Sequence, residues 1–163
     1  MYLIDGNNLM GRTPGIGVMT PDARRRLLHR LAAFRNLSGH RRRRITVVFD
    51  GAPEPQFPHG SSFQGVRILY AQPHSSADDV IRNIVAQQRD RRALTVVTSD
   101  RELYGYVRAC GIRALTCEQF NDHLDAILEA AGAEEKEERE LSRQEIDEWM
   151  RYFGITGEQG SQP

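Results

Sequence analysis

Three apolar segments of this sequence each end at an aspartate, and this pattern limits the fold more than any other feature. The segments read "YLID", "ITVVFD" and "LTVVTSD", and they end at Asp5, Asp50 and Asp100. Short runs of apolar, largely β-branched residues are typical of strands buried on both faces of a sheet. We therefore expect three buried strands that each deliver a carboxylate at their carboxyl end.

Segments with helical spacing of apolar residues alternate with the predicted strands. We expect one helix from Thr20, as its capping residue, to about Leu37. A second helix opens at Ser76, where Asp79 completes a capping box. The alternation continues with strands over residues 66–71 and 112–115 and with helices after residue 100 and over 117–131. This order predicts an α/β fold with three layers, α/β/α, around a central, mostly parallel sheet of about five strands.

In a parallel sheet the carboxyl ends of the strands bind ligands at one edge. Asp5, Asp50 and Asp100 are therefore expected at the same edge. Asp78 begins the helix after the third strand and should lie there too. Its neighbour Asp79 is assigned to the helix cap, because its spacing fits the capping box better.

Four carboxylates at one edge repel one another unless a cation binds or some of them stay protonated. Carboxylate oxygens with open positions suit Mg²⁺ or Mn²⁺. Such an ion can polarise a phosphodiester and stabilise the leaving oxygen. Each acid alone is also explained as a turn or helix-capping residue. It is their expected convergence that predicts metal-dependent chemistry on phosphate.

The net charge of the chain is zero, but it is unevenly distributed. Residues 1–128 contain 18 Arg and no Lys against 12 acidic residues, a net charge of +6, whereas residues 129–163 carry −6. A basic body indicates a polyanionic partner. We expect a body over residues 1–131 and an acidic helical tail over 132–163 with a disordered end.

Composition and the absence of targeting patterns predict a cytoplasmic protein without a membrane partner. No apolar run approaches the roughly 18–20 residues of a membrane span, and the sequence opens in a predicted strand rather than a signal peptide. Cys110 and Cys117 fit no metal motif and are expected to be reduced thiols. The sequence does not fix the oligomeric state.

Four motifs together carry a resemblance to a known family. In order along the chain they are "LIDGNNLM", "VVFDG", "SADDVI" and "VVTSDREL". With them, residues 1–130 resemble the YacP-like branch of the NYN domains, in the PIN-like nuclease superfamily. The resemblance implies a three-layer α/β/α fold and an endoribonuclease that cleaves RNA with Mg²⁺ or Mn²⁺. It also implies the ribosome as a candidate partner.

The resemblance assigns roles to single residues. The acidic positions that are both catalytic and metal-binding match Asp5, Asp50, Asp78 and Asp100. Asn8 matches the asparagine of the first motif, which would orient a ligand or water in catalysis. Ser99 matches the small hydroxyl residue before the last aspartate and is expected to contact the bound RNA. Arg12 and Arg101 flank the expected site, and for each both an RNA phosphate contact and a surface ion pair stay open.

Two other functions stay open at the level of sequence. An RNA- or ribosome-binding module with little catalysis would explain the basic body, but it would gain nothing from four clustered acids. A metal-dependent phosphatase for small phosphates would explain the acids, because α/β folds carry many chemistries. The arginine-rich body and the long loop after Asp50 favour a polymeric substrate over a small one.

Overall fold

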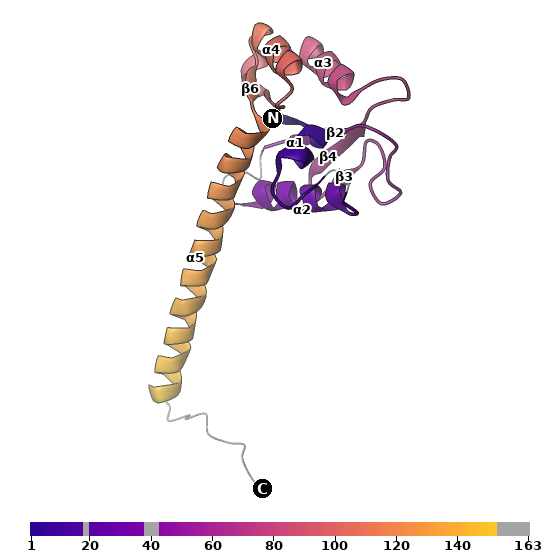
Figure 1. Ribbon diagram of the computed structural model, residues 1–163. Coiled ribbons are helices and arrows are strands. Elements are labelled where there is room, and N and C mark those ends of the chain that lie inside the picture. The colour runs from indigo at the N-terminus through magenta and orange to yellow at the C-terminus, as the bar shows by residue number, and fades with distance from the viewer. Residues whose placement is uncertain (18–19, 38–42, 153–163) are drawn as a thin grey trace. The chain divides into compact units, whose positions relative to one another are not determined.

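The chain forms two compact units, Met1–Ala126 and Ile127–Pro163. The computed structural model describes residues 1–17, 20–37 and 43–152 (Figure 1). The predicted disordered end falls largely on residues 153–163, which lie outside the described residues. None of the helices within the described ranges has both the length and the apolar character needed to cross a membrane.

The first unit is built on a mixed sheet of six strands, in the order β3-β4-β2-β1-β5-β6. The strands are β1 Tyr2–Asp5, β2 Ile45–Phe49, β3 Ser62–Phe63, β4 Val66–Tyr70, β5 Thr95–Val97 and β6 Arg113–Leu115. All pairs are parallel except β3 with β4. The predicted α/β fold with five parallel strands is confirmed, and β3 is a sixth strand that the sequence analysis missed.

Helices cover both faces of this sheet. The helices of the described residues are α1 Gly6–Arg12, α2 Ala23–Asn36, α3 Ala77–Gln87, α4 Arg101–Ala109 and α5 Cys117–Tyr152, with a short 3₁₀ helix, η1, at Arg91–Ala93. Figure 1 shows α3 and α4 on one side of the sheet and α2 on the other. On the first side, Ile81 of α3 and Leu103 of α4 are fully buried in one core cluster with Leu3 and Val96. Buried strands between two helical layers explain why the strand sequences are apolar without alternation.

Two helix boundaries differ from the sequence-based expectation. α2 begins at Ala23, because Asp22 adopts a left-handed conformation (φ 68°) that ends any helical run from Pro21. The Thr20 hydroxyl donates to the Gly17 carbonyl instead of capping the helix. α5 continues without a break through residues 131 and 132, where the body was expected to end. Residues 133–140 are all alanine, glutamate, lysine or arginine, which have high helix propensity, and no proline interrupts this stretch.

The segment between β2 and β4 was expected to be a long loop, and it is partly ordered against the sheet. Phe57 is buried, and its N–H donates to the Glu54 carbonyl (2.9 Å). His59 accepts a hydrogen bond from the Tyr70 N–H through Nδ1 (3.0 Å). The segment thus closes the outer edge of the sheet before β4 begins.

Gly6 allows α1 to follow β1 without a loop. A Cβ atom at this position would lie 2.4 Å from Cε1 of Phe49 and 2.9 Å from Cγ2 of Val47. Both neighbours are fully buried residues of β2. The glycine after Asp5 is therefore required by close helix–strand packing rather than by a turn.

We expect Gly6→Ala to lower the free energy of unfolding by about 1–3 kcal/mol, because the added methyl group overpacks the core. The matched control is Gly105→Ala in α4, where a Cβ would meet nothing within 4 Å. That variant should be more stable than the wild type by about 0.5–1 kcal/mol. Urea unfolding measures both, and equal effects would show that Phe49 is not the reason for Gly6.

Candidate active site

The register of the central strands brings three aspartates to one edge of the sheet. Asp5 pairs with Val48 of β2, so that Asp50 follows two residues beyond this pair. On the other side, Ile4 pairs with Val97 of β5, and Asp100 lies three residues beyond. The carboxyl ends of β1, β2 and β5 therefore meet as the sequence predicts.

Each of the three carboxylates accepts a main-chain hydrogen bond from the start of a helix. Oδ1 of Asp5 accepts from the Asn8 N–H (3.0 Å), Oδ1 of Asp50 from Ala77 (2.7 Å), and Oδ1 of Asp100 from Leu103 (2.8 Å). Asp5 and Asp100 are the N-caps of α1 and α4. The capping explanation is thus correct for these two, and it occupies one carboxylate oxygen of each.

Burial dominates the electrostatics of Asp5, which is 4% exposed. The pKa of Asp5 is raised to about 6, mainly by burial and in smaller part by the charges of Asp78 and Asp50. The Asn8 N–H and the Thr98 hydroxyl oppose this rise in pKa. Asp5 is therefore the acid whose ionised form the protein stabilises least and whose charge a cation would relieve most.

Asp78 and Asp79 are neighbours with opposite electrostatics. The pKa of Asp78 is raised, first by burial and then by the charge of Asp100, while Arg82 opposes the rise. The pKa of Asp79 is lowered by hydrogen bonds from Ser76, with which it forms a capping box at the start of α3. This difference agrees with assigning Asp79 to the cap and Asp78 to the acidic edge.

The acids are electrostatically coupled, but they do not form a ready-made metal cluster. Within residues 1–17, 20–37 and 43–152, no three His, Cys, Asp or Glu side chains are grouped closely enough to hold an ion. Mg²⁺ keeps several waters and commonly uses only one or two carboxylates. The donor chemistry of the edge thus fits a hydrated Mg²⁺ or Mn²⁺ ion, with Asp5, Asp50, Asp78 and Asp100 as the available oxygen ligands.

Two adjacent asparagines join the strand ends at this edge. Oδ1 of Asn8 accepts from the Ser99 N–H (3.1 Å), and Oδ1 of Asn7 accepts from the Asp50 N–H (3.2 Å). Both asparagines lie in the first turn of α1, directly after Asp5. Their side chains therefore fix the segments that follow β5 and β2 relative to Asp5. Asn8 therefore positions the Ser99–Asp100 turn through its carbonyl oxygen.

Glu118, which the sequence analysis missed, contacts two of the predicted RNA-binding residues. Its Oε1 pairs with Nη1 of Arg12 (2.7 Å), and its Oε2 accepts from the Ser99 hydroxyl (2.7 Å). The Ser99 hydroxyl and, more weakly, Arg12 hold the pKa of Glu118 down to about 2. A signal for it exists in the sequence, since Glu118 also follows an apolar strand and opens a helix.

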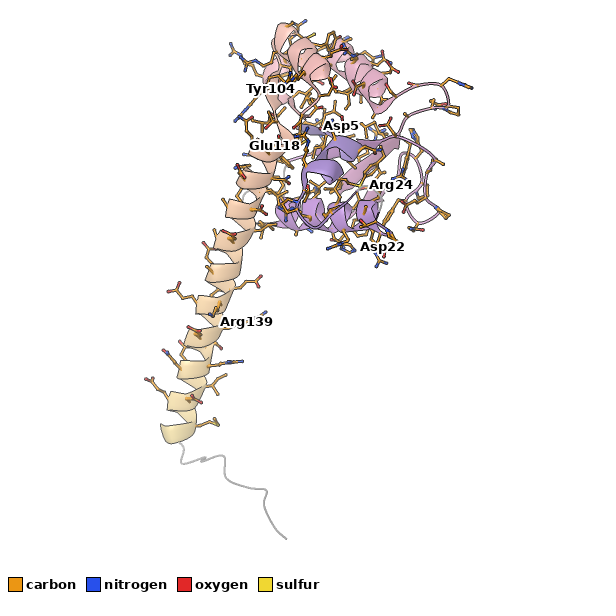
Figure 2. The ribbon with its side chains drawn as sticks, viewed as in Figure 1. Asp5, Asp22, Arg24, Tyr104, Glu118 and Arg139 are labelled. Carbon is orange, nitrogen blue, oxygen red and sulfur yellow. The ribbon has the colours of Figure 1, made fainter. Side chains whose placement is uncertain are left out.

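The remaining arginines of the edge differ in their surroundings. Arg101 is exposed at the first turn of α4. Arg24, which the sequence analysis did not single out, donates to the carbonyl oxygens of Asp50 (2.7 Å) and Ala52 (2.9 Å). Figure 2 labels Arg24 with Asp5 and Glu118, and these three come from α2, β1 and α5. Arg24 therefore fixes the chain that leaves Asp50.

A family model described as "YacP-like NYN domain" matches residues 2–152. The chain belongs to this family. The match extends past the resemblance found over residues 1–130 and takes in all of α5. The YacP-like NYN domains are a PIN-like nuclease family, and membership supports a ribonuclease function.

Solved structures agree with this YacP-like NYN membership at the level of the fold. The crystal structure of Rae1 (YacP) from Bacillus subtilis has 18% sequence identity and a TM-score of 0.67, over 94% of this chain and 92% of that one. The W164L mutant of the same protein has 19% identity and a TM-score of 0.64, over 87% and 83%. No curated protein is significantly similar in sequence.

We expect Asp5→Asn to stabilise the metal-free protein at neutral pH. The folded-state pKa of about 6 exceeds the ordinary 3.8, so ionised Asp5 lowers stability as the pH rises through this window, and below it the effect vanishes. Asparagine keeps the acceptor for the Asn8 N–H but carries no charge. The gain at pH 7.5 should be on the order of 1 kcal/mol or more.

Thermal unfolding with chelator at pH 7.5 and pH 4 checks this expectation. The gain should be largely lost at pH 4, where Asp5 is protonated in the folded state and partly protonated in the unfolded chain, whose ordinary pKa is 3.8. Asp122→Asn, at an exposed position of α5, is the control and should change stability little at either pH. A loss of stability in Asp5→Asn at pH 7.5 would show that the charge itself supports the fold.

Proposed function

We propose that the protein is a metal-dependent endoribonuclease that hydrolyses phosphodiester bonds of RNA, acts in the cytoplasm and uses Mg²⁺ or Mn²⁺. The observation that carries the proposal is the meeting of Asp5, Asp50 and Asp100 at one sheet edge, with Asp78 electrostatically coupled to them. Membership of a PIN-like nuclease family gives this acidic edge its chemical context.

Asp5 and Asp100, with one or both of Asp50 and Asp78, would hold a hydrated metal ion, one or two of these carboxylates directly and the others through its water molecules. The Oδ1 atoms of Asp50 and Asp100 accept the helix N–H bonds, so their Oδ2 atoms are the natural ligands. When bound, such an ion supplies stabilisation for the negative charge that develops on the phosphate. It would also offset the burial and the repulsion that together raise the pKa of Asp5.

The protein's own residues orient the substrate around these acids. Asn8 holds the Ser99–Asp100 turn against β1 through its bond to the Ser99 N–H. The exposed Arg101 next to Asp100 is the arginine best placed to receive an RNA phosphate. The surplus of arginine in residues 1–128 attracts a polyanion over a longer range.

The two alternatives make different demands on the acids. A binding module for RNA or the ribosome would gain nothing from four clustered acids. A phosphatase for small phosphates would need no surplus of positive charge over the body. The combination of clustered acids and a basic body therefore favours a nuclease that acts on RNA.

Asp78→Asn and Asp79→Asn form a matched pair for testing the site. We expect Asp78→Asn to reduce cleavage of a short RNA at least 100-fold, because it removes a charge from the metal edge. Asp79→Asn should keep cleavage within a few-fold of the wild type and lower stability by roughly 0.5–2 kcal/mol, because it weakens the cap of α3. Turnover and thermal unfolding are measured side by side. Loss of activity in Asp79→Asn alone would overturn the assignment.

Metal binding should be visible without catalysis. Mn²⁺ at 100 times its dissociation constant stabilises a folded protein by about 2.7 kcal/mol, or roughly 5–10 °C for a chain of this size. We expect this rise in melting temperature for the wild type and for Asp79→Asn, and a loss of it in Asp5→Asn and Asp100→Asn. An unchanged rise in both of the latter would place the ion elsewhere.

The ribosome is a candidate partner, because the family resemblance implies it. Cleavage of a structured and of a single-stranded RNA with purified protein and Mn²⁺, with and without ribosomes, tests this part of the proposal. A requirement for ribosomes would appear as cleavage only in their presence. Equal rates in both conditions would show that the protein acts on RNA alone.

A further inference from the structure

The carboxylate of Glu118 is held at the edge of the site by groups that would also bind a phosphate. Arg12 of α1 donates to one of its oxygens and the Ser99 hydroxyl to the other, each over 2.7 Å. Ser99 in turn accepts a hydrogen bond from the Cys117 N–H (2.9 Å). A guanidinium and a hydroxyl converging on two oxygens are a common arrangement for binding a phosphodiester.

This position is directly connected to the acidic edge. Ser99 precedes Asp100, and its N–H donates to Oδ1 of Asn8 (3.1 Å), whose own N–H donates to Asp5. An anion held by Arg12 and Ser99 would therefore lie beside the acids and would belong to the same bound strand of RNA as the phosphate that is cut.

We propose that Arg12 and the Ser99 hydroxyl form a binding site for an RNA phosphate next to the cleaved one, and that Glu118 occupies this site until RNA displaces it. This inference rests on the proposed function and extends it to a second phosphate contact. Glu118 is then an internal competitor of RNA rather than a catalytic residue.

Because the ion pair is exposed, replacing it with a bound phosphate costs little free energy. The side chains of Arg12 and Glu118 are 56% and 49% exposed, and exposed ion pairs contribute little to stability. Glu118 can turn into solvent, where water replaces both of its partners. A phosphodiester gives Arg12 two acceptor oxygens, which a guanidinium binds in parallel.

Equilibrium binding separates this idea from a structural role of Glu118. The probe is a labelled single-stranded oligoribonucleotide, bound with chelator present so that it is not cut, at salt concentrations from 50 to 200 mM. We expect Glu118→Gln to bind about fivefold more tightly than the wild type. Its plot of log affinity against log salt should steepen by about 0.7, the value for one additional phosphate contact on a single strand.

Four further variants keep the result interpretable. Arg12→Gln should bind more weakly than the wild type, and Arg12→Gln/Glu118→Gln should bind no better than Arg12→Gln, because the gain depends on the freed arginine. Glu118→Ala removes the acceptor altogether and should reproduce the gain. Glu102→Gln removes the same charge from an exposed position two residues after Asp100 and should change affinity less than twofold.

The outcomes distinguish this inference from the proposed function. If the wild type binds and cleaves RNA but Glu118→Gln binds no more tightly than Glu102→Gln, the phosphate site is wrong and the nuclease stands. The same conclusion follows if the double variant keeps the full gain. If the wild type neither binds nor cleaves RNA under any of the conditions above, the proposed function and this inference both fail.

Discussion

The parallel pairing of β1 with β2 on one side and β5 on the other underlies the rest of this structure. Each of these strands is apolar on both faces because helices cover the sheet on both sides. Their common direction sends Asp5, Asp50 and Asp100 to one edge, and it places Asp5 of the central strand deepest. A different register of any of these strands would separate these carboxylates and remove the basis of the proposed chemistry.

Asp5 and Asp100 have a structural role as helix caps in addition to the chemical role proposed above. The hydrogen bonds that cap α1 and α4 hold the carboxylates of Asp5 and Asp100 in fixed positions. Burial of Asp5 raises its pKa and so favours its neutral form. When Asp5 is ionised and no metal is bound, the free energy of unfolding is therefore lower. A cation-binding edge requires carboxylates that are held in place. A bound cation would stabilise the ionised form of Asp5, which the surrounding protein disfavours.

Positive groups around this edge are restrained by the protein itself. Arg24 is committed to carbonyl oxygens after β2, and Arg12 is paired with Glu118. Arg101 is the exposed cation beside Asp100. The net charge of the body is therefore a poor guide to the positive charge available next to the acids. In the proposal above, the pairing of Arg12 with Glu118 determines whether Arg12 can contact a polyanion.

Local sequence patterns determined the five parallel strands, the order of the elements and the position of Asp5, Asp50 and Asp100 at the carboxyl ends of strands. They also determined the capping box of α3, because its two members are three residues apart. The start of α2, the short strand β3 and the unbroken course of α5 could not be predicted. The first depends on a left-handed residue and the second on pairing with β4, and no local signal marks where a solvated helix stops.

The ion pair between Arg12 and Glu118 was decided by tertiary structure alone. Its partners are 106 residues apart, and only the packing of α1 and the start of α5 against the same strand ends brings them together. The sequence could place an arginine and an acid near the edge, because strand ends are readable locally. It could not show that one would neutralise the other, because charge pairing depends on distances that only the folded chain sets.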